Sequence, residues 1–140
     1  MEDRRRKGRV KSQVGAMAVE VLYYQGYRII HFVLEGVVDH DAQMEHVRTI
    51  ARLVEASDRP ILMLVDVKGF IPTKDYMDFA SRESEAHKDK VAKSAFYNVD
   101  RSNRVLFELY DRFNTGIRKR KTFRDRAEAL RWLVSDSPEA

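Results

Sequence analysis

Cysteine is absent from all 140 residues of the chain. A protein without cysteine can have no disulfide framework, thiol nucleophile, iron–sulfur cluster or cysteine-ligated zinc site, which excludes several classes of enzyme. Long hydrophobic segments are also lacking, because the longest apolar run, residues 60–65, is far too short to span a bilayer. The arginine-rich start is not followed by the apolar run of a secretory signal. We therefore expect a cytoplasmic protein without a transmembrane segment.

Recognisable catalytic and metal-binding motifs are lacking as well. The four histidines, which are His31, His40, His46 and His87, form neither a His-x-x-x-His pair nor a His-Glu-x-x-His helix. The sequence also contains no Gly-x-Ser-x-Gly elbow, phosphate-binding glycine loop or dinucleotide fingerprint. Asp66 follows a predicted strand, but a lone carboxylate there is explained by hydrogen bonds to its own loop. We therefore expect a protein that is not an enzyme and has no metal site or cofactor.

The net charge of +4 is concentrated in the first 11 residues. These hold six basic and two acidic side chains, so the remainder of the chain is formally neutral. Such a segment has too little apolar surface to offset its ordering entropy. We predict a disordered basic tail over residues 1–16, one domain over 17–134 and a short tail over 135–140, with Met17 as an alternative start. No aromatic-interleaved RNA motif accompanies the basic residues, so we do not expect a nucleic-acid partner.

Five segments have the composition of β-strands. They are residues 19–24, 27–34, 61–65, 91–99 and 121–124. Gln25-Gly26, between the first two, suits the tight turn of an antiparallel hairpin. The third segment is a continuous apolar run, which is typical of a central strand covered on both faces.

Four amphipathic helices are predicted between and after these strands, because apolar residues recur there every three or four positions. Their N-caps are expected at Asp39 or Asp41, Thr73, Ser102 and Asp125. The resulting order, β-β-α-β-α-β-α-β-α, implies right-handed crossovers between parallel strands. The expected fold is a single α/β domain with a mostly parallel sheet of about five strands, an N-terminal hairpin and four helices.

Three segments carry a resemblance to a known family. They are the strand-to-loop segment 64–69, the strand and helix 96–113 with its Ser102-Asn103-Arg104 start, and the closing segment 122–133. In the last of these, Phe123, Ala129, Trp132 and Leu133 match the terminal signature Phe-x-x-x-x-x-Ala-x-x-Trp-Leu. With these residues and its order of elements, the chain resembles the SpoIIAA-like branch of the STAS family over residues 17–134.

The resemblance implies a non-enzymatic module that regulates through protein contact. In the anti-sigma-factor antagonists of the family, a serine at the start of the helix after the central strand is phosphorylated, which switches a protein interaction off. The matching region here, residues 71–76, lacks the family's Asp-Ser pair, and Asp75 lies nearest the serine. Thr73 keeps a hydroxyl, which either caps the helix or accepts a phosphate at the positive end of the helix dipole.

We therefore centre the candidate binding surface on residues 66–76, with Ser102-Asn103-Arg104 as an optional extension and another protein as the expected partner. Asp66 and Gly69 would set the loop, whereas Lys68 and Lys74 would offer positive charge to an acidic partner or a phosphate. The full set of interaction or phosphorylation candidates is Asp66, Lys68, Gly69, Thr73, Lys74, Asp75 and Ser102.

An apolar ligand is the alternative that the sequence leaves open. The SpoIIAA-like branch is similar in fold to the CRAL-TRIO lipid carriers, so a lipid or another small apolar molecule could lie between sheet and helices. The candidate cavity residues are Phe70, Tyr76, Phe79, Phe107 and Tyr110. The same spacing is typical of ordinary core packing. The oligomeric state is equally open, with a dimer among the options.

Overall fold

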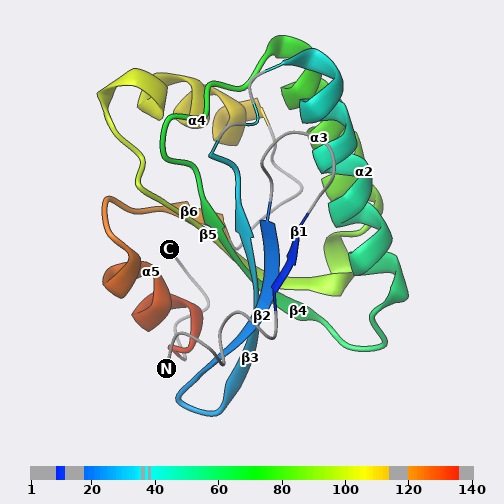
Figure 1. Cartoon of the computed structure of the whole chain (residues 1–140), viewed down its shortest axis with the longest axis vertical. Helices are drawn as coiled ribbons and strands as arrows, with labels where there is room; N and C mark the ends of the chain where they lie inside the picture. The colour runs from blue at the N-terminus through cyan, green and yellow to red at the C-terminus, as the bar shows by residue number, and fades with distance from the viewer. Residues whose placement is uncertain (1–8, 12–17, 36, 38, 114–119, 136–140) are drawn as a thin grey trace.

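The computed structural model describes residues 9–11, 18–35, 37, 39–113 and 120–135 of the chain (Figure 1). Its strands are β1 (Arg9–Lys11), β2 (Ala18–Tyr24), β3 (Tyr27–Val33), β4 (Ile61–Asp66), β5 (Val91–Tyr97) and β6 (Arg120–Thr122). Its helices are α2 (His40–Ala56), α3 (Lys74–Ala86), α4 (Arg101–Phe113) and α5 (Arg126–Leu133), with a single 3₁₀ turn η1 (Lys88–Lys90). All the predicted strands and helices are present, which confirms the predicted α/β fold.

The strands form one sheet in the order β1-β2-β3-β4-β5-β6. The pairs β1–β2 and β2–β3 are antiparallel, whereas the pairs from β3 to β6 are parallel. A helix joins each parallel pair, namely α2, α3 and α4 in turn, because parallel strands need a long crossover. The carboxyl ends of the parallel strands therefore meet along one edge of the sheet, and the loops that follow them lie together there.

Strand β1 lies within the segment that composition assigns to a disordered tail. Residues 9–11 pair antiparallel with residues 18–20 of β2, so the tail prediction is wrong for these three residues. Backbone hydrogen bonding to an open sheet edge needs no apolar side chains, and composition alone therefore does not reveal it. The rest of residues 1–16, and residues 136–140 of the expected C-terminal tail, lie outside the described residues.

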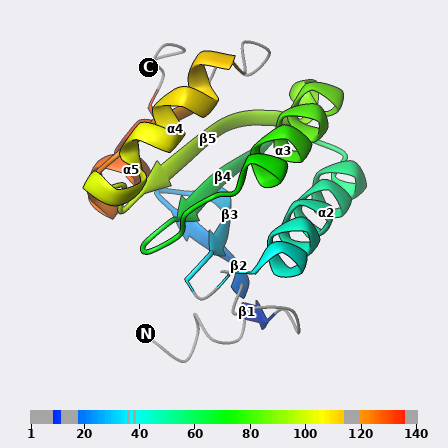
Figure 2. The same ribbon diagram turned by 90° about the horizontal axis from the view of Figure 1, so that it is seen from above.

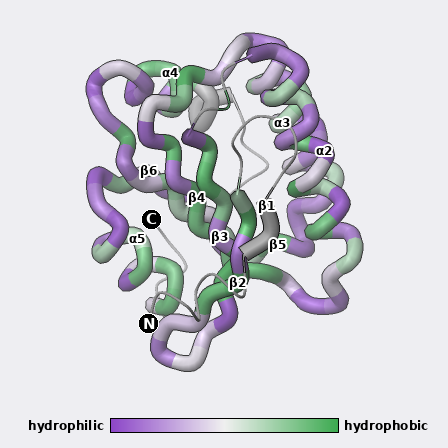
Figure 3. The backbone as a smooth tube through the Cα atoms, viewed as in Figure 1, coloured by the Kyte–Doolittle hydropathy of each residue, from purple (hydrophilic) through white to green (hydrophobic). Residues whose placement is uncertain are grey.

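Helices cover both faces of the sheet, which explains the continuous apolar run in β4 (Figure 2). Met63 and Val65 belong to the core cluster under α2 and α3. Leu64 points to the opposite face and belongs to the cluster that contains Ala129 and Trp132 of α5. Figure 3 shows mainly hydrophobic residues along β4, whereas hydrophilic and hydrophobic residues alternate along α2 and α3.

Local signals set the hairpin turn and three helix starts, as the sequence predicts. Gln25 and Gly26 both have positive φ, 51° and 85°, which is the conformation of a two-residue type I′ turn. Asp39, Thr73 and Asp125 each accept a hydrogen bond from the backbone N–H three residues later, at 2.8, 3.1 and 2.9 Å. These three side chains are therefore the N-caps of α2, α3 and α5.

The predicted cap at Ser102 is wrong, because Asp100 caps α4 instead. Its Oδ1 accepts hydrogen bonds from the backbone N–H groups of Ser102 and Asn103, at 2.9 and 3.3 Å. In return, Asn103 Oδ1 accepts from the Asp100 N–H at 3.0 Å, which completes a reciprocal arrangement like a capping box. A carboxylate also gains from the helix dipole, which favours aspartate over a hydroxyl at this position.

Candidate functional site

Asp66 is the last residue of β4 and lies where two loops meet. Its Oδ1 accepts hydrogen bonds from the Lys68 backbone N–H at 3.0 Å and from Asn98 Nδ2 at 2.9 Å. The expected bond from its own loop is therefore present, and a second one joins that loop to the end of β5. Gly69 has a φ of 70°, a conformation that glycine adopts without strain.

Asn103 fixes the same loop from the other side. This side chain on α4 is completely buried, and its Nδ2 donates to the carbonyl oxygens of Val67 and Phe70 at 3.0 and 3.3 Å. The loop after β4 is thus held by Asp66 and Asn103 together. Sequence reasoning assigned Asn103 no such role, because the contact depends on how α4 crosses the end of the sheet.

Thr73 is engaged on two sides. Its hydroxyl accepts from the Tyr76 N–H at 3.1 Å and donates to Gln43 Oε1 at 3.2 Å, while its backbone N–H donates to the same oxygen at 3.0 Å. Gln43 is a buried residue of α2, and its Nε2 donates to the Ile71 carbonyl at 3.1 Å. The capping interpretation of Thr73 accounts for this geometry, and its phosphorylation stays a prediction.

Lys74 and Asp75 face solvent on the first turn of α3. The Lys74 ammonium pairs with Asp78 at 2.9 Å, and this hydrogen bond raises the pKa of Lys74. The Asp75 carboxylate lies 3.8 Å from His40 Nδ1. The structure therefore places both charges on the α2–α3 side of the loop, engaged with neighbouring helix residues.

A groove of about 770 Å³ lies at the carboxyl edge of the sheet, and we call it the carboxyl-edge groove. It is lined by Lys68, Asn98, Val99, Asp100, Arg101, Arg104, Thr122, Phe123 and Arg124. Four of these side chains are cationic and come from the three segments that follow β4, β5 and β6. The sequence placed Lys68 in the candidate surface and Arg104 in its extension along Ser102-Asn103-Arg104. Arg101 and Arg124 were missed, because only the parallel pairing of the strands brings them together.

Among the described residues that line the groove, the single carboxylate belongs to Asp100, the cap of α4. Its Oδ1 also accepts from the Ser102 hydroxyl at 2.6 Å, and the bonds from Ser102 lower the pKa of Asp100. Ser102 itself is exposed beside the groove. Arg104 lies 3.9 Å from Glu108 on the next turn of α4, a distance at which an exposed pair is weak. The groove therefore carries a net positive charge.

A buried chain of polar side chains runs beneath this edge. Glu20 Oε2 lies 2.8 Å from His31 Nδ1, and His31 Nε2 lies 2.8 Å from the Tyr97 hydroxyl. All three residues are buried, and burial lowers the pKa of His31 although Glu20 opposes the shift. Burial and the Asp66 carboxylate also raise the pKa of the Tyr97 hydroxyl. The strands β2, β3 and β5 are thus linked to Asp66 by groups that stay in their neutral histidine and tyrosine forms near pH 7.

The described candidates for the apolar cavity do not share one pocket, and apolar-ligand binding stays a prediction. Tyr76 and Phe107 together line a small pocket of about 20 Å³. Phe70 and Phe107 are buried in the core. The Cζ atoms of Arg48 and Arg82 lie 5.7 and 5.8 Å from the centre of the Phe79 ring. The fourth candidate, Tyr76, lines a real cavity, whereas the side chain of Tyr110 lies outside the described residues.

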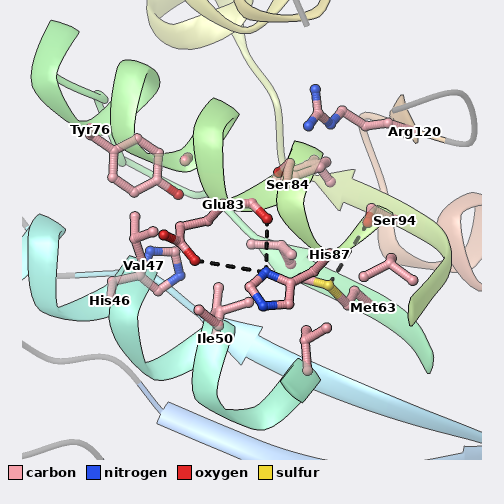
Figure 4. Close-up of a pocket in the computed structure, with 16 residues that line it drawn as sticks. His46, Val47, Ile50, Met63, Tyr76, Glu83, Ser84, His87, Ser94 and Arg120 are labelled. Carbon is pink, nitrogen blue, oxygen red and sulfur yellow. Dashed lines mark hydrogen bonds and ion pairs between the residues drawn. The ribbon is translucent and has the colours of Figure 1, made fainter. Parts of the chain in front are cut away.

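This cavity has a volume of about 90 Å³ and lies between α2, α3 and the sheet; we call it the α2–α3 cavity (Figure 4). Its walls are mainly apolar, and His46 of α2 is part of them. The His46 ring stacks on Tyr76, with ring centres 5.6 Å apart and planes 11° from parallel. Burial lowers the pKa of His46 to about 3. Sequence reasoning missed His46, because a lone histidine on a helix carries no motif.

Within the described residues, no group of three or more histidine, aspartate or glutamate side chains is placed to hold a metal ion. No helix in the same part of the chain has both the length and the apolar character needed to cross a bilayer.

Known proteins were compared with the chain by sequence and by structure. No family model and no curated protein matches it. A solved structure from Shewanella loihica PV-4, described as an uncharacterized protein from the DUF3478 family with a SpoIIAA-like fold, matches with a TM-score of 0.62. The two chains are 16% identical, and the match covers 89% of this chain and 98% of that chain. The chain therefore has the SpoIIAA-like fold that its sequence predicted.

Proposed function

We propose that this protein is a non-enzymatic binding module that captures an acidic or phosphorylated segment of a partner protein in the carboxyl-edge groove. One observation carries the proposal: Lys68, Arg101, Arg104 and Arg124 line a single groove although they belong to three separate segments of the chain. Arginine guanidinium groups bind carboxylate and phosphate through paired hydrogen bonds, and lysine adds a point charge.

The framework around the groove supports this function, because it holds the loops before a partner arrives. Asp66 bridges Lys68 and Asn98, and Asn103 holds the loop from α4. A binding surface that is already ordered loses less conformational entropy when it binds. The groove thereby extends the predicted surface at residues 66–76 toward the starts of α4 and α5.

An apolar stripe next to the groove favours a peptide over a free anion. Arg101, Val105 and Leu109 follow one another at four-residue spacing, so they lie on one side of α4. The side chains of Val105 and Leu109 are 66% and 39% exposed. An anionic side chain in the groove would place the flanking residues of its own chain along this stripe.

The proposed function includes a cytoplasmic location, which the absence of cysteine from the sequence supports.

A peptide-binding measurement tests the proposal. Fluorescence anisotropy would compare labelled twelve-residue peptides that carry phosphoserine, glutamate or serine at one position between leucines. We expect the phosphorylated and acidic peptides to bind and the serine peptide to bind at least about tenfold more weakly, since charge-assisted hydrogen bonds are lost. Affinity of the first two peptides should fall about tenfold in both Lys68→Glu and Arg104→Glu.

Lys88→Glu is the matched control. It makes the same charge change at η1, at the opposite edge of the sheet, where Lys88 pairs with Glu85. Equal weakening by Lys88→Glu would show that net charge, rather than the groove, drives binding. All three variants should keep the melting temperature of the wild type, because the altered side chains are exposed.

The apolar-ligand alternative is supported by the α2–α3 cavity, but only for a small molecule. Pockets for drug-sized ligands usually have about 300–1,000 Å³, whereas this cavity has about 90 Å³. A lipid chain does not fit within that volume. We therefore rank the carrier function below the groove-binding function.

A further inference from the structure

The α2–α3 cavity is lined mainly by aliphatic and aromatic side chains, with a few polar ones among them (Figure 4). Val47, Ile50 and Met63 represent the apolar wall. Glu83 and His87, which are half-buried, bring polar groups to the lining from the last turns of α3. His87 is already engaged, because it lies 2.9 Å from the Glu83 carbonyl and 3.2 Å from the Glu55 carboxylate.

His46 differs from these residues, because it is buried without any hydrogen bond. Only 2% of this residue is exposed, and within the part of the chain that the structure describes neither Nδ1 nor Nε2 has a hydrogen-bond partner. Nearly all buried polar side chains in folded proteins are paired, because an unpaired one keeps its full desolvation cost. Besides Tyr76, its ring contacts are with the edges of Phe32 and Phe70. Both nitrogens are buried, and His46 belongs to the lining of the cavity, so a turn of the ring would bring one of them to an occupant of the cavity.

The chemistry of that partner follows from the imidazole and the walls. A neutral histidine offers one N–H donor and one acceptor nitrogen, and a hydroxyl group can match either. The described lining also contains Glu83 and Arg120, one carboxylate and one guanidinium. A neutral ligand leaves these two groups undisturbed, whereas a charged one would also lose its hydration among the apolar walls. An apolar cavity of about 150 Å³ holds benzene, so about 90 Å³ suits a chain of a few carbon atoms.

We propose that the α2–α3 cavity binds a small, neutral, mainly apolar molecule with one hydroxyl group, which hydrogen-bonds to His46. This site lies under α3, on residues separate from those of the carboxyl-edge groove. The proposed ligand site is thus independent of the peptide-binding function, and an experiment that contradicts one proposal leaves the other unaffected.

The test is an NMR titration of the full chain with 1-butanol and 1-fluorobutane, which differ in the hydroxyl. Both probes should shift the methyl signals of Val47, Ile50 and Met63. We expect 1-butanol to bind about five- to tenfold more tightly, the usual effect of one net hydrogen bond. It should also shift the ¹⁵N signals of the His46 ring. Lys68→Glu should leave this titration unchanged.

Two variants separate the hydrogen bond from the cavity. His46→Phe keeps an aromatic ring against Tyr76 but removes both nitrogens, so the preference for 1-butanol should disappear. Ala51→Leu fills the cavity while His46 is kept, and it should reduce binding of both probes. If a variant does not fold, the ratio of the two affinities and the His46 ¹⁵N shift in the wild type still decide the question.

Three outcomes would overturn the proposal. The first is that neither probe shifts the lining methyl groups. The second is equal affinity for both probes in the wild type, which would show that His46 makes no hydrogen bond to the ligand. The third is a long-lived water molecule at His46 that 1-butanol does not displace.

Discussion

At the carboxyl-edge groove charged groups face water and the polar atoms beneath them are hydrogen-bonded, whereas in the α2–α3 cavity a polar ring is buried without a partner. Lys68 and Arg104 are exposed, and the Asp66 and Asn103 side chains below them bond the loops. His46, by contrast, has two buried nitrogens without a hydrogen-bond partner among the described residues. The groove thus has exposed charged side chains above loops that hydrogen bonds hold in place. The cavity has apolar walls and one buried polar ring, that of His46.

The difference shows that two binding regions of one small domain can affect its folding stability in different ways. The charged side chains at the groove stay hydrated, so they lower the free energy of unfolding very little. They contribute binding energy only when an anionic partner binds. The buried imidazole costs stability whenever the cavity lacks a hydrogen-bonding occupant. Salt, pH and substitution should therefore affect the two regions differently, and this is what the following predictions measure.

The largest expected effect is on the free energy of unfolding, when the Asn103 hydrogen bonds that hold the loop beneath the groove are removed. Asn103→Ala removes two donated hydrogen bonds and one accepted bond, and leaves the carbonyl oxygens of Val67 and Phe70 without this donor. We expect the free energy of unfolding to fall by about 2–4 kcal/mol, and peptide affinity to fall with it. Urea denaturation measures the first quantity. Ser102→Ala, on the exposed side of the same turn, should cost less than about 1 kcal/mol; an equal cost would show that the buried bonds are unimportant.

The second effect is a pH dependence from the cavity. The pKa of His46 is lowered to about 3 in the folded state, against about 6.5 in the unfolded chain. As pH falls below 6.5 the unfolded state binds a proton that the folded state does not, so stability is lost from about pH 6.5 down to about pH 3. From pH 7.5 to pH 5 this contribution lowers the unfolding free energy by about 2 kcal/mol.

Comparison of the wild type with His46→Phe isolates that contribution, because His31 and His87 titrate in both proteins. Urea denaturation at pH 7.5 and pH 5 should show the variant losing about 2 kcal/mol less than the wild type. The variant should also be more stable at pH 7.5, since it has no unpaired nitrogens. Parallel losses in both proteins would mean that His46 is protonated in the folded state.

The third effect is a difference in salt dependence. Raising NaCl from about 0.05 to 0.5 M should weaken binding of the phosphorylated peptide about three- to tenfold, because exposed charges are screened. Binding of 1-butanol should change by less than about twofold, since the proposed contact is between neutral groups. Anisotropy and NMR titrations measure the two affinities. Salt-independent peptide binding would place the binding energy in the apolar stripe of α4 instead of the groove.

The smallest effect concerns Lys74, which was a sequence candidate but lies outside the groove lining. Lys74→Glu breaks an exposed pair with Asp78 on α3, so stability should change by less than about 0.5 kcal/mol. Peptide affinity should change by less than about twofold. A loss as large as that of Lys68→Glu would move the binding surface back to the first turn of α3, where the sequence alone placed it.

Sequence reasoning succeeded where the signal was local. The Gln25-Gly26 turn and the caps at Asp39, Thr73 and Asp125 depend on neighbouring backbone groups, and all four are present. It failed even locally at Ser102, where a hydroxyl was preferred to the carboxylate two residues earlier. Strand β1 was missed because its pairing uses backbone atoms that every residue has.

The sequence by itself determined the order of the elements after β1, three of the four helix caps and the α/β class, because apolar periodicity and capping act over a few residues. Only the tertiary structure decided which distant side chains meet. Parallel pairing of β4, β5 and β6 brings Lys68, Arg101 and Arg124 to one groove. The packing of α2 and α3 on the sheet likewise buries both His46 nitrogens away from any hydrogen-bond partner in the described segments. Such contacts depend on strand register and helix packing, and the spacing of residues along the chain predicts neither of them.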